Sequence, residues 1–134
     1  NKGSKDKVSL GMAVLDENYL VGKIVEVNYT TSRVLLISDL NSKIPVIIEP
    51  GNVQSILSGS GKDQGVIQYF RSSREITSDN IVFTSGSGGI FKAGIPIGKI
   101  ENVQTNKNYN TDFFSNLDQL TFVKLVSYQK ESKN

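Results

Sequence analysis

The stretch TSGSGGIFKAGIPIGKI, residues 84–100, holds the densest run of glycine in the chain and lies between two strand-like segments. Glycine at this density indicates a backbone with positive φ, or an approach too close for a Cβ atom. Two interpretations compete for its Ser-Gly-Ser-Gly-Gly core. It is either a serine nucleophile among oxyanion-binding amides or a tight structural turn that shapes a partner surface. The remainder of the chain has to decide between them.

The composition of the chain excludes several kinds of site. Its 134 residues are enough for one ordinary domain or two very small ones that share a core. The absence of histidine removes the commonest general base and zinc ligand, and the absence of cysteine removes disulfides and thiolate sites. A net charge of +2 gives no reason to expect nucleic acid as a partner.

Short β-type runs separated by turns follow one another from Val8 onward and predict an all-β barrel or sandwich. The runs alternate apolar and polar residues or are rich in β-branched residues. We place strands at residues 19–28, 32–38, 44–49, 53–57, 65–70, 81–84, 95–104 and 120–128. The polar segment TNKNYNTD, residues 105–112, is predicted to be a long turn.

A short internal echo predicts two related units. LVGKIVEV at residues 20–27 matches PIGKIENV at residues 96–103 in its Gly-Lys-Ile core and flanking apolar positions. A glycine at the same place inside two strands indicates the same bend or bulge built twice. The predicted fold is therefore all-β, with two small β-barrel-like domains packed in tandem. We divide the chain into a linker at 1–7, a first β-domain at 8–57, a second at 58–119, a last strand at 120–128 that can return to the first domain, and a tail at 129–134.

Known catalytic and ligand-binding patterns fail on inspection. A serine within residues 85–89 needs a base, and without histidine only a lysine such as Lys62 or Lys92 remains, with no spacing that brings either close. GIPIGK, residues 94–99, is one residue short of the phosphate-binding spacing. The carboxylates are isolated along the chain. We therefore predict no catalytic residue, no cofactor-binding residue and no metal ligand, and we expect that the protein is not an enzyme.

Several motifs occur together in an order that resembles the extracytoplasmic part of the rod shape-determining protein MreC family. The resemblance covers about residues 8–126. It is carried by GMAV at 11–14, VGKI at 21–24, TSRVLL at 31–36, NSKIPV at 41–46, ILSGSG at 56–61, VFTSGSGGIF at 82–91 and GIPIG at 94–98. One residue departs from the pattern: Lys92 stands where family members usually carry proline, which implies a less rigid turn or a local charge.

The resemblance implies a non-enzymatic scaffold of the bacterial cell-elongation machinery that helps to maintain rod shape. Its implied partners are a class B penicillin-binding protein, MreD, RodA and further copies of itself, in a dimer or a filament. It also implies an extracytoplasmic location, in the periplasm or at the cell exterior, with attachment to the cytoplasmic membrane only through an N-terminal helix outside this sequence. Because the chain begins with Asn1, we expect it to start inside a longer protein.

The predicted interaction site is the glycine turn, and its residues are Thr84, Ser85, Gly86, Gly88, Gly89 and Phe91. Under this hypothesis the glycines shape a surface for self-association or partner binding, and Phe91 is either a buried lid or an exposed anchor. Two other classes stay open as alternatives: a double-barrel serine hydrolase that uses a Ser–Lys pair, and a peptidoglycan-binding β-module. The second has little support, because the chain has no tryptophan and only five tyrosines for stacking on sugars.

Overall fold

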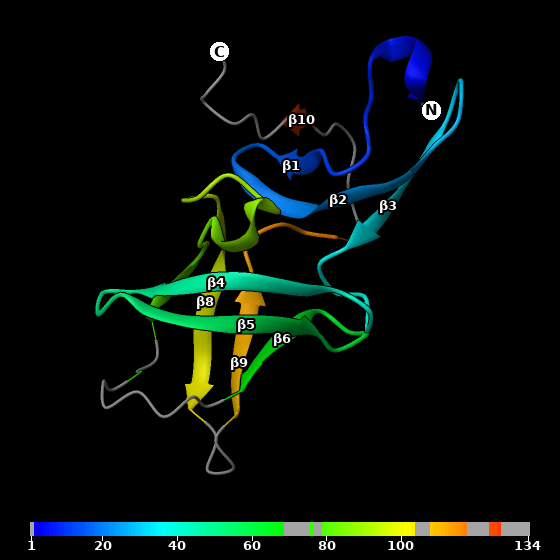
Figure 1. Ribbon diagram of the computed structural model, residues 1–134. Helices are drawn as coiled ribbons and strands as arrows, with labels where there is room; N and C mark the ends of the chain where they lie inside the picture. The colour runs from blue at the N-terminus through cyan, green and yellow to red at the C-terminus, as the bar shows by residue number, and fades with distance from the viewer. Residues whose placement is uncertain (1, 69–75, 77–78, 104–107, 118–123, 127–134) are drawn as a thin grey trace, which may run out of the picture.

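The computed structural model describes residues 2–68, 76, 79–103, 108–117 and 124–126. Within these residues the fold is all-β, as predicted, with a closed barrel beside a separate four-stranded sheet (Figure 1). The first unit is thus an open sheet in the described part of the chain, and a pair of tandem barrels is not confirmed. The predicted tail at 129–134 and most of the predicted last strand lie outside the described residues.

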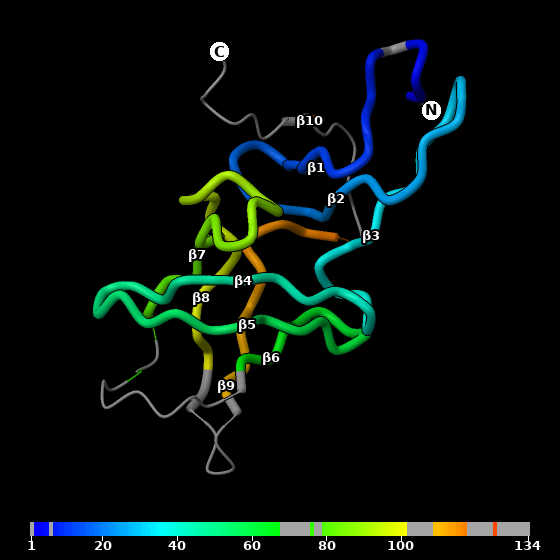
Figure 2. Tube along the Cα trace, in the orientation of Figure 1, coloured from blue at the N-terminus to red at the C-terminus, as the bar shows by residue number. Residues whose placement is uncertain are grey.

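Six strands close the barrel in the order β4-β5-β6-β9-β8-β7, each antiparallel to its neighbours (Figure 2). Along β4, buried and less buried residues alternate, and the buried ones are Ile44, Val46 and Ile48. This period of two is expected where one face of a strand is buried. The strands are β4 (Lys43–Glu49), β5 (Val53–Gly59), β6 (Gln64–Gln68), β7 (Ile81–Thr84), β8 (Pro96–Val103) and β9 (Asn108–Phe113).

The four-stranded sheet has the order β10-β1-β2-β3. Its strands are β1 (Ala13–Asp16), β2 (Tyr19–Val27), β3 (Ser32–Leu36) and β10 (Lys124–Val126). Because β10 pairs with β1, the chain returns to this sheet after it has passed through the barrel. A short 3-10 helix, η1 (Ser4–Asp6), precedes the sheet, and its first two amides donate to the carbonyl oxygens of Asn28 and Tyr29.

The three-stranded units β1-β2-β3 and β7-β8-β9 share one pattern of strand pairing. The equivalent pairs are Val14–Gly22 and Val82–Gly98, Gly22–Leu36 and Gly98–Phe113, and Ile24–Val34 and Ile100–Thr111. In both units the register shifts directly after the last of these pairs, so the same bulge occurs at the same place. The Gly-Lys-Ile echo therefore marks the same bulged strand in two sheets, as predicted.

The two Gly-Lys-Ile segments need their glycines, Gly22 and Gly98, because the backbone of the neighbouring strand lies very close to each. A Cβ atom on Gly22 would collide with the carbonyl oxygen of Leu35 on β3. A Cβ atom on Gly98 would collide with the carbonyl oxygen of Asp112 on β9. Only glycine lets the neighbouring strand come this near at the bend.

The two units differ most in the connection between their first two strands. Only Glu17 and Asn18 join β1 to β2, whereas residues 85–95 join β7 to β8. The glycine-rich stretch is therefore the enlarged version of a tight hairpin connection. It includes the second 3-10 helix, η2 (Ser87–Gly89).

One hydrophobic core runs through both units. Ala13, Leu15 and Leu20 of the sheet belong to the same buried cluster as the interior of the barrel. A second, smaller cluster covers the other face of the sheet, where Val14, Val21 and Ile24 are buried and Leu117 packs against them. The sheet is thus covered on both faces, and one of its covers is the barrel itself.

Two predictions made from the sequence have different outcomes: one is wrong, and the other is not tested by the structure. The segment 105–112 was predicted to be a turn, and this is wrong for residues 108–112, which belong to β9; residues 105–107 lie outside the described residues. The sheets change between Leu36 and Lys43, so β4 and β5 pair within the barrel although the predicted boundary at residue 57 assigns them to the first domain. Strand pairing does not test independent domains, and the boundary at residue 57 stays a prediction.

The close approaches at the echo glycines predict a specific loss of stability. Alanine at Gly22 or Gly98 should lower the free energy of unfolding by about 3 kcal/mol, because the added carbon overlaps a strand carbonyl that cannot move away. Gly94→Ala is the control, since its φ is +90° but nothing lies within 4 Å of the added atom, and it should cost about 1 kcal/mol. Urea denaturation checks this, and equal losses in all three variants would contradict it.

Candidate functional site

The glycine turn, which we define as residues 84–94, is a loop in which four glycines adopt the left-handed conformation. Gly86, Gly88, Gly89 and Gly94 have φ values of 81°, 73°, 67° and 90°. At Gly86 there is also little space, because a Cβ atom would lie 3.0 Å from the Cβ of Ala93 on the returning arm of the loop. The sequence run of glycines thus corresponds to a turn that other residues would strain.

Thr84 holds the two arms of the glycine turn together. Its hydroxyl donates to the carbonyl oxygen of Lys92 at 2.7 Å and accepts from the amide of Ile95 at 2.9 Å. Its backbone carbonyl accepts from the amide of Gly94 at 2.9 Å. Thr84 is only 1% exposed, so these bonds form away from water. The buried hydroxyl therefore acts as a clasp at the base of the loop.

The loop also rests on the barrel at its start. The amide of Ser85 donates to the carbonyl oxygen of Pro45 on β4 at 3.1 Å. The hydroxyl of Ser85 accepts from the amide of Ser87 at 3.2 Å. Lys92, the departure from the family pattern, uses its backbone carbonyl in the clasp, while the residue itself is exposed and adds a positive charge at the surface.

The six predicted site residues lie on this one loop but at different depths. Gly88 and Gly89 are exposed at the tip, whereas Ser85 and Gly86 are half-buried. Thr84 and Phe91 are buried, and Phe91, at 3% exposure, belongs to the core cluster of the barrel. Phe91 is therefore in the position of a buried lid and not of an exposed anchor.

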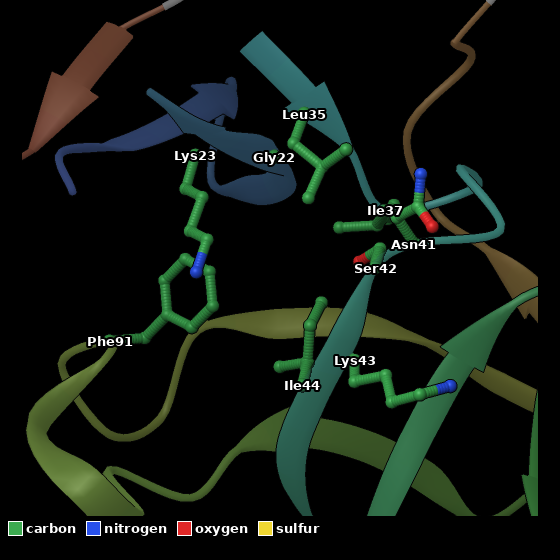
Figure 3. Close-up of a pocket in the computed structure, with 9 residues that line it drawn as sticks. All are labelled: Gly22, Lys23, Leu35, Ile37, Asn41, Ser42, Lys43, Ile44 and Phe91. Atoms are coloured by element: carbon green, nitrogen blue, oxygen red, sulfur yellow. The ribbon is translucent and has the colours of Figure 1, made fainter. Parts of the chain in front are cut away.

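Phe91 also borders a cavity of about 220 Å³ between the sheet and the barrel (Figure 3). Lys23 reaches toward the Phe91 ring from β2, and Ile44 lies below on β4. The remaining lining residues are Gly22, Leu35, Ile37, Asn41, Ser42 and Lys43. The sequence analysis did not select Lys23 as a site residue; its place beside the echo glycine was the only signal that could have pointed to it.

The described part of the chain shows no activating hydrogen bond for a serine of the glycine turn. In the part of the chain that the structure describes, no hydrogen bond joins a lysine to Ser85 or Ser87. The same described residues contain no group of three or more acidic, histidine or cysteine side chains that could hold a metal ion. No helix among them has the length and apolar character needed to cross a membrane.

Fold and site together define a class of protein. A closed barrel shares its core with a bulged sheet, and a clasped glycine loop presents an exposed tip. Such a module offers fixed surfaces. It is therefore typical of an all-β structural or interaction module.

Comparison with known proteins identifies the family. Residues 1–127 match the family model described as "Rod shape-determining protein MreC, barrel core". The chain is 40% identical over 96 residues to the cell shape-determining protein MreC of Caulobacter vibrioides, and 36% identical over 111 residues to that of Haemophilus influenzae. These matches cover 72% and 81% of this chain but 28% and 32% of the relatives. The chain belongs to the MreC family, whose members are cell shape-determining structural proteins and not enzymes.

Solved structures agree with the fold. The crystal structure of MreC from Pseudomonas aeruginosa has a TM-score of 0.85 at 29% identity and covers 94% of this chain and 85% of that chain. The major periplasmic domain of the cell shape-determining filament MreC has a TM-score of 0.79 at 22% identity, covering 92% and 82%. MreC from Helicobacter pylori, solved in a complex with the penicillin-binding protein PBP2, has a TM-score of 0.70 at 24% identity, covering 88% and 78%.

The clasp predicts that Thr84 matters for its hydroxyl and not for its shape. Thr84→Val should lower the free energy of unfolding by about 2 kcal/mol, because the Ile95 amide and the Lys92 carbonyl lose a buried partner. Thermal unfolding measures the loss, and hydrogen exchange at the Ile95 amide should become faster.

Thr111→Val is the matched control for this prediction. Thr111 is fully buried on β9, and its hydroxyl has no hydrogen-bond partner in the described structure. Its equivalent in the first unit, Val34, is already a valine. Valine at position 111 should be neutral or stabilising. A Thr84→Val protein as stable as the Thr111→Val protein would show that the clasp has no role.

Proposed function

We propose that this chain is a non-enzymatic scaffold domain of the bacterial cell-elongation machinery, which binds cell-wall synthesis proteins and further copies of itself to maintain rod shape. The observation that carries the proposal is membership of the MreC family across residues 1–127. The chain spans only about a third of the relatives that it matches, so the role of the whole protein is extended to it here as a proposal.

The proposed main partner is a class B penicillin-binding protein. The complex of PBP2 with the Helicobacter pylori protein, which has the same fold, supports this choice. MreD and RodA are further proposed partners, by the family resemblance alone. Dimer or filament formation is proposed on the same ground, and the periplasmic filament protein of similar fold supports it.

The proposed location is extracytoplasmic, in the periplasm or at the cell exterior. The similar fold of a periplasmic MreC domain supports it. Attachment to the cytoplasmic membrane would come from an N-terminal helix outside this sequence. We further propose that the open sheet and the barrel act as two domains in tandem.

The proposed partner surface is the tip of the glycine turn. Ser87, Gly88 and Gly89 are exposed there, while Thr84 and Phe91 hold the loop from beneath. A loop fixed before binding loses little conformational entropy when a partner docks. The tip carries no charged side chain, so shape and backbone groups would provide the recognition.

Replacing Gly88 with valine tests this surface. The added side chain has room, since the nearest atoms of Ile90 are 3.8 Å from the Cβ position, but φ of +73° is strained for valine and should shift the tip. The dissociation constant for the ectodomain of the penicillin-binding protein should rise by about tenfold, a loss of similar size to that strain. Biolayer interferometry measures it.

Gly11→Val is the matched control, because Gly11 has φ of +85° with nothing within 4 Å and lies before β1, outside the turn. It should bear the same strain and bind the partner as the parent chain does. If the Gly88→Val protein also bound like the parent chain, the tip would not be the partner surface. If the parent chain did not bind the ectodomain at all, the proposed partner would be wrong.

A further inference from the structure

A lysine side chain starts from the face of the four-stranded sheet that meets the barrel. Lys23 on β2 lies directly opposite Ala13 on β1 and Leu35 on β3. Directly opposed residues of antiparallel strands point to the same face of a sheet. Ala13 belongs to the core cluster that the sheet shares with the barrel, so Lys23 also points toward the barrel. The half-buried lysine reaches toward the Phe91 ring (Figure 3).

The equivalent lysine of the second unit has acidic neighbours that Lys23 does not have. Lys99 on β8 lies opposite Asp112 on β9, and its ammonium nitrogen is 3.6 Å from a carboxylate oxygen of Asp79. In the described part of the chain, no ion pair or hydrogen bond engages the Lys23 ammonium. A charge beside apolar walls interacts more strongly with an opposite charge than one in open water does. Lys23 is therefore well placed to bind an anion.

The cavity beside Lys23 has an apolar wall and no acidic group. Its volume of about 220 Å³ corresponds to roughly seven water molecules, which is the size of a small carboxylic acid. None of its nine lining residues is acidic. Lys43 directs its ammonium to the Ser58 hydroxyl on β5, at 3.4 Å, so Lys23 provides the charge that faces the cavity. The wall is formed by Leu35, Ile37, Ile44 and Phe91.

A buried hydroxyl also faces this cavity. Ser42 is only 5% exposed, and its backbone amide and carbonyl bond to Asp39 and Gly59. No hydrogen bond among the described residues uses its side chain. Figure 3 shows the side-chain oxygen on the side toward Lys23 and Phe91. Because buried polar groups are almost always hydrogen-bonded, this hydroxyl marks a position for a polar atom from outside the chain.

We propose that this cavity binds a carboxylate carried on a short apolar chain. The Lys23 ammonium and the Ser42 hydroxyl donate to the carboxylate oxygens, and the apolar chain lies against the wall of the cavity. An inorganic anion fits less well, because it would leave that wall in contact with water. A small free carboxylic acid and the C-terminal residue of a peptide share this chemistry. The inference goes beyond the proposed scaffold role and does not depend on it.

Isocaproate, a carboxylate on a short branched hydrocarbon chain, is the probe that tests the cavity. In a nuclear magnetic resonance titration it should shift the amide signals of Gly22, Lys23 and Phe91, with a dissociation constant of about 1 mM, as expected for a ligand of so few atoms. The uncharged isocaproamide should bind at least about tenfold more weakly, because it cannot form the ion pair. Unchanged signals at ~50 mM isocaproate, or equal binding of the amide, would overturn the proposal.

Lys23→Met removes the ammonium and keeps a long apolar side chain. It should raise the dissociation constant for isocaproate at least about tenfold. Lys99→Met is the matched control, because it removes the same charge at the equivalent strand position outside the cavity, and it should bind as the parent chain does. Lys23→Arg keeps the charge and should bind within about threefold of the parent chain. Equal binding by the Lys23→Met and Lys99→Met proteins would show that the cavity is not the site.

Ser42→Ala is a second variant that leaves every charge in place. It should raise the dissociation constant by about fivefold, because one hydrogen bond to the carboxylate is lost. Circular dichroism checks that each variant is folded. Binding by a folded Ser42→Ala protein that equals the parent chain would remove the hydroxyl from the site and contradict the proposed geometry.

The peptide N-acetyl-alanyl-leucine distinguishes the two sources of the carboxylate. Tighter binding than isocaproate, lost in Lys23→Met, identifies the C-terminus of a peptide as the ligand. Binding of isocaproate alone, with the same dependence on Lys23, identifies a small free acid. Either result supports the proposal, and binding of neither overturns it. These titrations need no penicillin-binding protein, so their failure leaves the proposed scaffold role unaffected.

Discussion

The fold depends on two places where a strand carbonyl occupies the space that a side chain would fill. Leu35 contacts the backbone at Gly22, and Asp112 does the same at Gly98, each just before a bulge. The close approach and the bulge together bend the middle strand of each three-stranded unit. In the second unit that bend accompanies closure by β4, β5 and β6, and in the first it accompanies an open sheet covered by the barrel. The same close approach at a strand glycine thus occurs both in the closed barrel and in the four-stranded sheet.

The sequence predicted well what depends on local pattern. The all-β class, eight of the strands and the repeated Gly-Lys-Ile geometry could all be read from alternation and glycine placement, although parts of three predicted strands (65–70, 95–104 and 120–128) lie outside the described residues. It failed at residues 108–112, because Asn, Thr and Asp in β9 resemble a turn, and only pairing with β6 and β8 makes them a strand. The membership of β4 and β5 in the barrel was equally hidden, since strand order is decided by contacts distant in sequence.

The position of the candidate site in the sequence could be predicted, but the burial of its residues could not. A run of glycines indicates backbone with positive φ, and Gly86, Gly88 and Gly89 have positive φ in the structure. No local pattern shows that Thr84 is a buried clasp or that Phe91 faces the core. The clasp depends on Lys92 and Ile95, and the burial of Phe91 depends on core residues elsewhere in the chain. The loop is thereby an enlarged hairpin connection held at its base, which explains how a glycine-rich segment can keep one shape.

The continuous core has a mechanical meaning. Side chains from β1 and β2 are buried among those of the barrel, and Ser115 at the barrel exit donates to the carbonyl of Leu20 across the junction. Rotation of one unit against the other would expose this apolar surface and break a buried hydrogen bond. The glycine turn and the four-stranded sheet are therefore held together by one packed core. A force on the turn would therefore pass to the sheet through packed side chains and a buried hydrogen bond.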